Sequence, residues 1–168
     1  MEALPPERLC WIDQSGLKND IRSLRGWSPC GELCLGIKPA KHTEKANIMA
    51  GCMVGKLVAP IQYSENTTGD IVESWFENKL LKAVPKGTIF IMDNAPFHRK
   101  KKLEALAASA GCSILWLPSY APDLNKIENS WATIKHYARK FLARSGATLK
   151  WAILRAIATF QKKLTLVG

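Results

Sequence analysis

The sequence has no apolar run that approaches the roughly 20 residues needed to cross a membrane. Its start, MEALPPERL, lacks the charged and apolar segments of a secretion signal. Internal repeats, low-complexity segments and a linker long enough to divide domains are absent as well. These absences predict a cytoplasmic protein with no membrane partner. At 168 residues the chain suits one domain with a sizeable core.

The five cysteines do not fit a disulfide framework. Their number is odd, and three of them lie inside apolar runs that we expect to be strands. Cys30 and Cys34 lack a second pair of cysteines or histidines at zinc spacing. We therefore expect reduced, buried thiols and no zinc site.

Acidic residues are scarce in the C-terminal part of the chain. Residues 99–168 contain 13 Lys and Arg but only 3 Asp and Glu, whereas residues 1–98 contain 11 of each. The whole net charge of +10 therefore falls in the C-terminal part. A basic surface can serve solubility alone, but its segregation to one region favours a polyanionic partner, and nucleic acid is the obvious candidate.

Residues 88–117 predict a strand, a helix and a second strand. Thr88–Met92 and Cys112–Leu117 are short apolar runs of the kind found in buried strands. Between them, Lys100–Ala110 has apolar residues at helical spacing, and Gly111 follows as a C-cap. We expect these segments to form a parallel strand-helix-strand unit.

The rest of the chain predicts the other elements of an α/β fold. Strands are expected at Leu9–Ile12, ending at Asp13 before a turn at Ser15-Gly16, and in a hairpin of Ala46–Met53 and Leu57–Tyr63. Helices are expected from Thr67 or Thr68 to about Lys82, from Asp123 with Ile127, Trp131 and Ile134 on its core face, and from Leu149 to Phe160. This order predicts a mixed sheet with antiparallel N-terminal strands and parallel C-terminal strands, flanked by helices.

Three carboxylates are expected to meet at one edge of this sheet. Asp13 and Asp93 end neighbouring strands, and Glu128 lies in the first turn of a helix, 34 residues separating it from Asp93. Such a cluster repels itself unless a proton or a cation neutralises it, and its oxygen ligands suit magnesium better than zinc. Each residue also has an ordinary interpretation: Asp13 as a turn former, Asp93 as a strand-to-loop residue, and Glu128 as part of a capping box with Asn125.

The same residues carry a resemblance to a known family. Four strings match it: WID at 11–13, GWSPCG at 26–31, MDNAPFH at 92–98 and, most specifically, LPSYAPDLNKIE at 117–128. On these strings the chain resembles the catalytic domain of DDE-type insertion-sequence transposases related to mariner, from about Leu9 to about Phe160. The resemblance implies a ribonuclease H-like fold. It places the family's catalytic and metal-binding carboxylates on Asp13, Asp93 and Glu128.

The resemblance also implies chemistry and partners. It implies cleavage and joining of DNA strands by in-line displacement at phosphodiesters, with two Mg²⁺ ions, or Mn²⁺ as a substitute, about 3.5–4 Å apart. Double-stranded DNA is the implied partner, both as transposon ends and as target, in a bacterial cytoplasm near the nucleoid. A homodimer is left open.

The sequence departs from the family's pattern in three ways. Gln14 replaces an acidic residue, and Lys126 replaces a proline. Only 12 residues precede Asp13, where the family generally carries helix-turn-helix domains. We therefore expect a flexible tail at 1–8, a catalytic domain at 9–163 and no helix-turn-helix domain. Three alternatives stay open: a stand-alone nuclease of the same fold, a non-catalytic DNA-binding remnant, and a second reading frame that needs an upstream frame for its DNA-binding domain.

Basic and polar residues near the carboxylates are further candidates. Those expected to contact DNA, against the common alternative of a solvated helix face, are Lys100, Lys101, Lys102, Lys135 and Arg139. The last two follow Glu128 by seven and eleven residues, and so share its helix face. Those expected to support the carboxylates are Asn94, His98 and Asn125. For His98 we expect mainly local hydrogen bonds.

Overall fold

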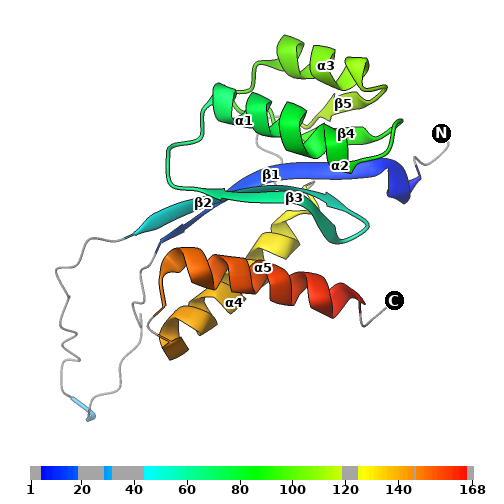
Figure 1. The fold of residues 1–168 in the computed structure, drawn as a ribbon. Helices are drawn as coiled ribbons and strands as arrows, with labels where there is room; N and C mark the ends of the chain where they lie inside the picture. Colours follow the sequence, from blue (N-terminus) through cyan, green and yellow to red (C-terminus); the bar gives the residue numbers. More distant parts are fainter. Residues whose placement is uncertain (1–4, 19–28, 32–43, 119–124, 146, 166–168) are drawn as a thin grey trace.

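The sheet is built around β1 (Leu9–Lys18), which is its middle strand. The computed structural model describes residues 5–18, 29–31, 44–118, 125–145 and 147–165, and Figure 1 shows their arrangement. Five strands are hydrogen-bonded in the order β3-β2-β1-β4-β5. Because β1 pairs antiparallel with β2 and parallel with β4, the sheet is mixed, as the sequence predicts.

β2 (Lys45–Met53) and β3 (Lys56–Tyr63) form the predicted hairpin. Its two-residue turn consists of Val54 and Gly55, with φ angles of 47° and 77°. Two successive residues in this left-handed region match the twist of the flanking strands. The hairpin places β3 at one edge of the sheet.

The predicted helix after the hairpin is present but is not uniform. It consists of α1 (Gly69–Trp75), a π-helical segment η2 (Phe76–Leu80) and α2 (Leu81–Ala83). The hydroxyl of Thr68 accepts a 3.4 Å hydrogen bond from the Ile71 amide and caps its start. The sequence predicts the cap and the length, but not the π-helical turn.

The strand-helix-strand unit is confirmed as parallel. It consists of β4 (Ile89–Met92), α3 (Lys100–Ser109) and β5 (Ser113–Trp116). Gly111, with a φ of 71°, follows α3, in the left-handed conformation that commonly ends a helix. β5 is the second edge of the sheet.

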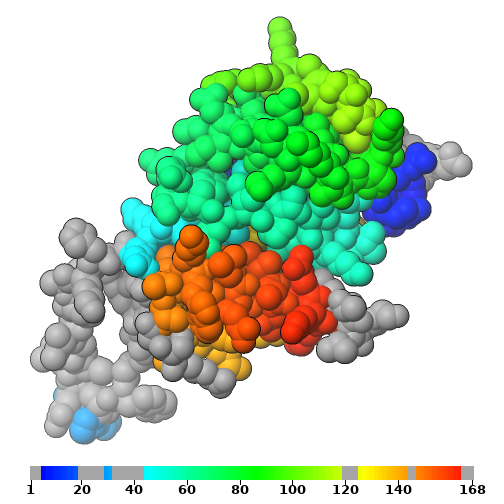
Figure 2. Space-filling model, viewed as in Figure 1, coloured from blue at the N-terminus to red at the C-terminus, as the bar shows by residue number. Residues whose placement is uncertain are grey.

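Two helical layers enclose the sheet. α4 (Glu128–Ser145) and α5 (Leu149–Thr165) lie on one face, and α1, η2 and α3 lie on the other (Figure 1). The space-filling view shows the same layers as an orange-red body and a green body with the sheet between them (Figure 2). None of the helices in the described ranges is both long enough and apolar enough to cross a membrane.

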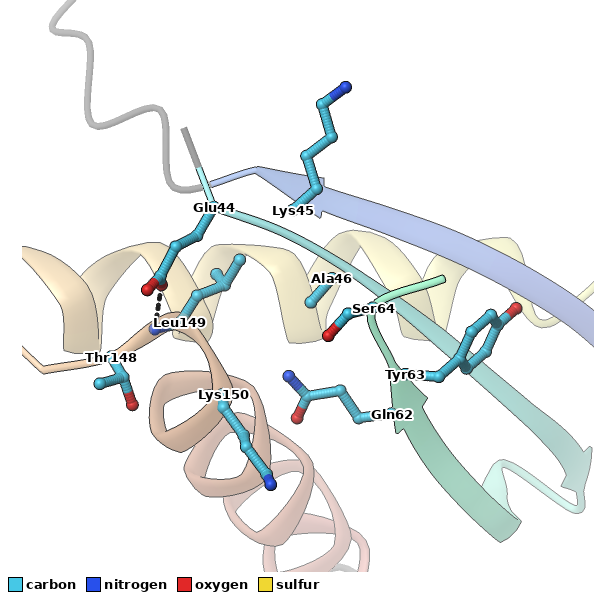
Figure 3. Close-up of a pocket in the computed structure, with 9 residues that line it drawn as sticks. All are labelled: Glu44, Lys45, Ala46, Gln62, Tyr63, Ser64, Thr148, Leu149 and Lys150. Atoms are coloured by element: carbon cyan, nitrogen blue, oxygen red, sulfur yellow. Dashed lines mark hydrogen bonds between the residues drawn. The ribbon is translucent and has the colours of Figure 1, made fainter. Parts of the chain in front are cut away.

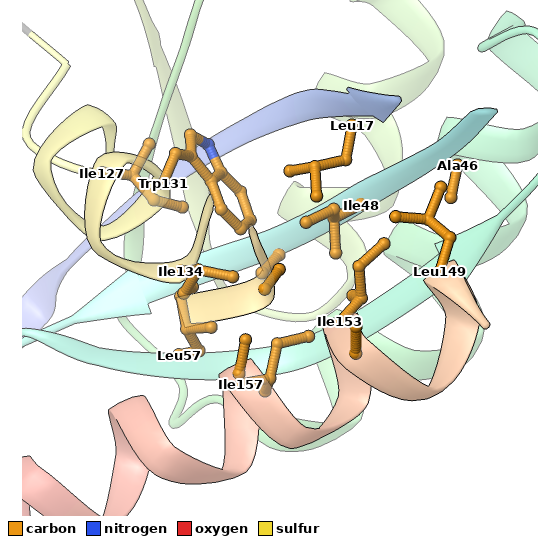
Figure 4. Close-up of a cluster of buried hydrophobic side chains, with 14 of the residues drawn as sticks. Leu17, Ala46, Ile48, Leu57, Ile127, Trp131, Ile134, Leu149, Ile153 and Ile157 are labelled. Carbon is orange, nitrogen blue, oxygen red and sulfur yellow. The ribbon is translucent and has the colours of Figure 1, made fainter. Parts of the chain in front are cut away.

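Each layer has its own hydrophobic core. The core under α4 and α5 is drawn in Figure 4 and includes Ile48, Trp131, Ile134 and Ile153. The core on the other face includes Ile12, Phe76, Phe90 and Leu103. Alternate residues of β1 and β2 therefore serve opposite cores, because successive side chains of a strand point to opposite faces.

α5 begins beside the start of β2 (Figure 3). Glu44 accepts a hydrogen bond from the Leu149 amide through Oε2 at 3.3 Å, and Thr148 accepts one from the Trp151 amide at 3.3 Å. The Glu44 carboxylate and the Thr148 hydroxyl accept hydrogen bonds from amides at the helix start that have no partner within the helix. The negative charge of Glu44 also interacts favourably with the helix dipole. The contact fixes α5 against the hairpin.

The structure corrects two expectations for the N-terminal residues. β1 runs on to Lys18, so Asp13 lies in its middle, and Ser15-Gly16 continue the strand rather than turning the chain away. The reason is the long partner β2, which pairs with every residue from Trp11 to Lys18. Before β1, Pro6–Arg8 form one turn of 3-10 helix, for which the fixed φ of proline is suited; the flexible tail expected at 1–8 stays a prediction.

Some predictions lie outside the described residues. These concern the first half of the GWSPCG string, at 26–28, the middle of the LPSYAPDLNKIE string, at 119–124, and with it the helix start expected at Asp123. Among the described cysteines, all four are free thiols. Cys10 and Cys52 are buried as predicted, whereas Cys30 is exposed.

Candidate active site

Asp13 is the most enclosed of the three predicted carboxylates. Cys10 and Ile12 of β1 belong to the core under α1 and α3, so the pleat directs Asp13 to the opposite face, toward α4. There the indole Nε1 of Trp131 donates a 3.0 Å hydrogen bond to Asp13 Oδ2. Because Trp131 is 1% exposed and packed in the core, this donor is held firmly in place.

Asp93 directly follows β4. Trp11 of β1 pairs with Ile91 of β4 in parallel register, so each aspartate stands two residues beyond this pair. The Asp93 side chain is 52% exposed, and Asn94 is exposed beside it. The two parallel strands thus bring Asp13 and Asp93 to the same end of the sheet.

Glu128 is the first residue of α4 and is exposed. Asn125, which is 6% exposed, holds this helix start against β1. Its Nδ2 donates to the Ile12 carbonyl at 3.3 Å, and its Oδ1 accepts from the Ile127 amide at 3.5 Å. Asn125 therefore links the helix that carries Glu128 to the strand that carries Asp13.

Electrostatic interactions connect the three carboxylates. Burial is the largest cause that raises the pKa of Asp13, from 3.8 to about 7. Glu128 and Asp93 raise this pKa further, whereas hydrogen bonds from the Gln14 backbone and the Trp131 indole lower it. A pKa near neutrality means that the protein stabilises the charged form of the Asp13 carboxylate poorly. A proton or a cation is therefore needed to neutralise this charge.

The chemistry of these ligands fits a hard divalent cation. All three groups offer carboxylate oxygens, which Mg²⁺ and Mn²⁺ accept. Within the described ranges, no three His, Cys, Asp or Glu side chains form a ready-made metal site. The exposed Glu128 side chain has three rotatable torsions, and rotation about them brings its oxygens toward or away from Asp13.

His98 connects Asp93 to the residue after Asp13. Its side chain is 1% exposed. Nδ1 lies 3.1 Å from the Asp93 carbonyl and 3.2 Å from Asp93 Oδ1, and Nε2 lies 3.2 Å from Gln14 Nε2. A carbonyl can only accept and an amide nitrogen can only donate, so the ring carries its proton on Nδ1 and accepts from Gln14 at Nε2. His98 has the local bonding role expected of it.

The basic run at the start of α3 is only partly available to a ligand. Lys102 Nζ lies 2.6 Å from Glu73 Oε2. Lys100 Nζ lies 5.1 Å from the centre of the Trp116 ring, in a cation-π contact. Lys101 is exposed. Of the three lysines predicted to contact DNA in this run, Lys101 is therefore the most available to a ligand.

The other two predicted DNA contacts lie on α4. Lys135 is half-buried and Arg139 is exposed. The helical repeat places them on the face that starts at Glu128, about 10 Å and about 16 Å along the axis from it. Arg139 also lines a hollow beside the last residues of β1 and the first of β2.

The structure adds residues that the sequence does not single out as part of the site. Trp131 is predicted only as a core residue, yet it donates to Asp13. Lys126, a departure from the family's pattern, places Nζ 5.6 Å from the centre of the Trp11 ring, two residues before Asp13. The sequence signal that could have placed Trp131 at the site is its position three residues after Glu128. The same spacing also fits ordinary packing of a helix against the core.

Comparison with known protein families gives a match over residues 8–150 to the model of the DDE superfamily endonucleases. The Tcb2 transposable-element transposase of Caenorhabditis briggsae is similar, with 25% identity over 108 residues. That alignment covers 61% of this chain and 40% of the relative. The chain thus matches less than half the length of this relative.

Solved structures of two kinds share the fold. The Mos1 transposase paired-end complex with the left transposon end matches with a TM-score of 0.64 and 17% identity, over 94% of this chain and 53% of that one. The HTLV-2 integrase catalytic core domain in complex with magnesium matches with a TM-score of 0.57 and 15% identity, over 94% of this chain and 87% of that one. The fold is ribonuclease H-like, as predicted. The chain spans about half the length of the Mos1 transposase.

Proposed function

Because the chain belongs to the DDE superfamily of endonucleases, as a catalytic domain of the mariner-related transposase type, we propose that it cleaves and joins DNA strands during transposition of an insertion sequence. The proposed substrates are phosphodiesters of transposon ends and of target DNA. Cleavage and joining are the same in-line displacement and differ only in the attacking oxygen, which belongs to water in the first and to a DNA 3′-hydroxyl in the second.

The observation that carries this proposal is the uncompensated charge at Asp13. A structural carboxylate in a protein interior is normally paired with a cation or several hydrogen-bond donors. Asp13 instead has hydrogen bonds from one indole N–H and the Gln14 backbone, is repelled by two further carboxylates, and has its pKa raised to about 7. This arrangement costs stability in the free protein and favours binding of a cation.

Asp13, Asp93 and Glu128 are the residues that would hold the divalent cation, either Mg²⁺ or Mn²⁺ and as one ion or two. The bound metal would supply neutralisation of phosphate charge and activation of the attacking oxygen. The structures that share the fold include an integrase core with magnesium and a Mos1 complex with Mn, which supports this choice of ions.

The chain's own residues orient the three carboxylates. Trp131 fixes Asp13 through Oδ2, and His98 fixes the backbone and side chain of Asp93. Asn125 fixes the start of the helix that carries Glu128. Such fixed geometry lowers the reorganisation needed when substrate binds, which is the main contribution a protein makes to a phosphoryl transfer.

DNA is the proposed partner because the basic excess lies in the part of the chain that contains α3 and α4. Contacts of Lys101, Lys135 and Arg139 with phosphates would add affinity without reading bases. We therefore expect binding that falls steeply with salt and depends little on sequence. A shallow salt dependence with strong preference for one terminal sequence would contradict this expectation.

The experiment that tests the function compares Asp13→Asn, Asp93→Asn and Glu128→Gln with a control, Glu77→Gln, which changes an exposed carboxylate on η2. Nicking and joining of labelled duplex DNA are measured with Mg²⁺ and with Mn²⁺, and folding is checked by thermal unfolding. We expect each site variant to lose both reactions and the control to keep them. If the Asp93→Asn/Glu128→Gln double variant cuts DNA as well as the parent, the proposed site is wrong.

A further inference from the structure

A second basic feature lies at the far end of β1 and β2. Six residues line a hollow of about 380 Å³ there, namely Gly16, Leu17, Lys18, Lys45, Asn47 and Arg139. Three of the six residues are cations from three different elements, and all three are exposed.

Two of these cations oppose each other directly. Lys18 of β1 pairs with Lys45 of β2 in the antiparallel register, and like charges in such a pair destabilise a sheet. None of the ion pairs formed among the described residues involves either lysine or Arg139. Glu44, the neighbour of Lys45, turns its carboxylate to the Leu149 amide, while Lys45 extends the other way (Figure 3). Within the described part of the chain, the cations therefore repel one another without an ion-pair partner.

The hollow is aligned with the proposed active site. Lys18 is five residues beyond Asp13 on β1, about 16 Å at the rise of an extended strand. Arg139 is eleven residues beyond Glu128 on α4, about 16 Å at the helical rise. The pleat directs Lys18 to the face opposite Asp13, whereas Arg139 comes from α4 on Asp13's face, and both line the hollow beside β1 beyond its pairing with β4. β1 and α4 therefore each carry a cation at about the same distance along the element from its carboxylate.

We propose that Lys18, Lys45 and Arg139 form a binding site for a backbone phosphate of the DNA strand whose scissile phosphodiester lies at the carboxylates. This inference rests on the proposed function. A phosphodiester is an anion that accepts hydrogen bonds from several donors at once, which suits two ammonium groups and a guanidinium. At 3.4 Å of helix axis per nucleotide of one strand, 16 Å corresponds to roughly five nucleotides. The site would fix the direction of the strand across the carboxylates.

The test uses the double variant Lys18→Gln/Lys45→Gln, with Lys56→Gln/Lys79→Gln as its control. The control removes the same charge from exposed lysines on β3 and η2. DNA affinity is measured against salt concentration with a duplex of arbitrary sequence. We expect the test variant to lower the slope of log affinity against log salt by about two counterions relative to the control.

A second measurement locates the phosphate. Duplexes in which one backbone phosphate at a time is replaced by an uncharged methylphosphonate are bound to the parent and to the test variant. The parent should lose affinity at a phosphate roughly five nucleotides from the cleaved position, and the test variant should not respond to that replacement. Equal slopes in test and control variants, or equal responses to every methylphosphonate, would overturn the phosphate site.

The outcomes separate the two proposals. A parent that cuts DNA, together with a test variant that keeps the parent's salt slope, leaves the function standing and removes the phosphate site. A parent that neither binds nor cuts DNA removes both. Arg139→Gln gives an independent check. This variant should lower the slope of log affinity against log salt by about one counterion, and it should lose its response to the same methylphosphonate.

Discussion

Two carboxylates, one on each face of the sheet, differ in the partners that the protein provides for their charge. Glu73 of α1 is 4% exposed, and its Oε2 lies 2.6 Å from Lys102 and 3.3 Å from Arg99. Arg99 also lies 2.8 Å from Asp70. Asp13 on the other face has no cation within ion-pair distance among the described residues. Its hydrogen bonds come from the indole of Trp131 and the backbone of Gln14.

The difference separates a structural role from a binding role. Glu73 joins α1 to the start of α3, and through Arg99 it fixes the segment that follows Asp93. Two cations of the protein neutralise its charge at Oε2, while the buried Oε1 has no hydrogen-bond partner among the described residues. Asp13 is left with a charge that the protein does not satisfy, which is expected where a ligand completes the electrostatics.

The largest effect that tests this comparison is expected from Asp13→Asn without divalent metal. The folded pKa of about 7 lies above the ordinary 3.8, so the folded parent binds more protons and loses stability as the pH rises from about 4 to about 7. The Asp13→Asn variant has no carboxyl group to ionise at this position, so it does not lose this stability. At pH 8 its free energy of unfolding should exceed the parent's by up to about 4 kcal/mol, and the gain should vanish near pH 4. Urea unfolding across this pH range measures it; a gain independent of pH would contradict the assignment.

Glu73→Gln should act in the opposite direction. It leaves Lys102 without its partner and weakens the hold on Arg99, both of which are about half exposed and can turn to water. We therefore expect a loss of about 2 kcal/mol in the free energy of unfolding rather than the larger cost of a fully enclosed pair. Urea unfolding measures this loss, with Glu77→Gln as the control. A variant as stable as the parent would show that this network is incidental.

Trp131→Phe sharpens the comparison by removing the one side-chain donor to Asp13. The indole bond lowers the pKa of Asp13, so the pKa should move above about 7. The acid limb of the pH dependence of DNA cleavage should move in the same direction, with a loss of about 1 kcal/mol in stability. Carboxyl-carbon NMR titration of Asp13 gives the pKa without relying on activity. An unchanged titration would mean that the bond does not form in solution.

The smallest effect is expected from Gln14→Ala, which removes the donor to His98 Nε2. The loss of one partly buried hydrogen bond should cost about 1 kcal/mol or less. A double-mutant cycle with His98→Ala measures the coupling between the two side chains. Zero coupling would show that His98 and Gln14 act independently and that only Asp93 is held by the histidine.

Most of the fold could be predicted from the sequence because its signals are local. The hairpin turn at Val54-Gly55, the Thr68 cap and the apolar run at Ile89–Met92 each depend on residues close in sequence. The true end of β1 could not, because Asp13 and Ser15-Gly16 resemble a turn until β2 supplies the pairing that keeps them extended. Tertiary pairing there outweighs local preference.

The three carboxylates of the candidate site could be proposed from the sequence, but the residues that surround them could not. Asp13, Asp93 and Glu128 stand in specific strings, whereas Trp131 has the spacing of an ordinary core residue. Lys18 and Lys45 lie in the part of the chain with no net charge, so a count of charges along the sequence hides them. They become a cluster only through the strand register and the approach of α4.

The position of β1 in the sheet also determines when the active site can first exist. Leu9–Trp11 pairs with Ile89–Ile91, and Asp13 meets Trp131 of α4. Contacts between residues so far apart in sequence form late in folding, and a chain emerging from the ribosome must be made beyond α4 before they can form. A growing or unfolded chain therefore has all the residues of the proposed active site without the site itself.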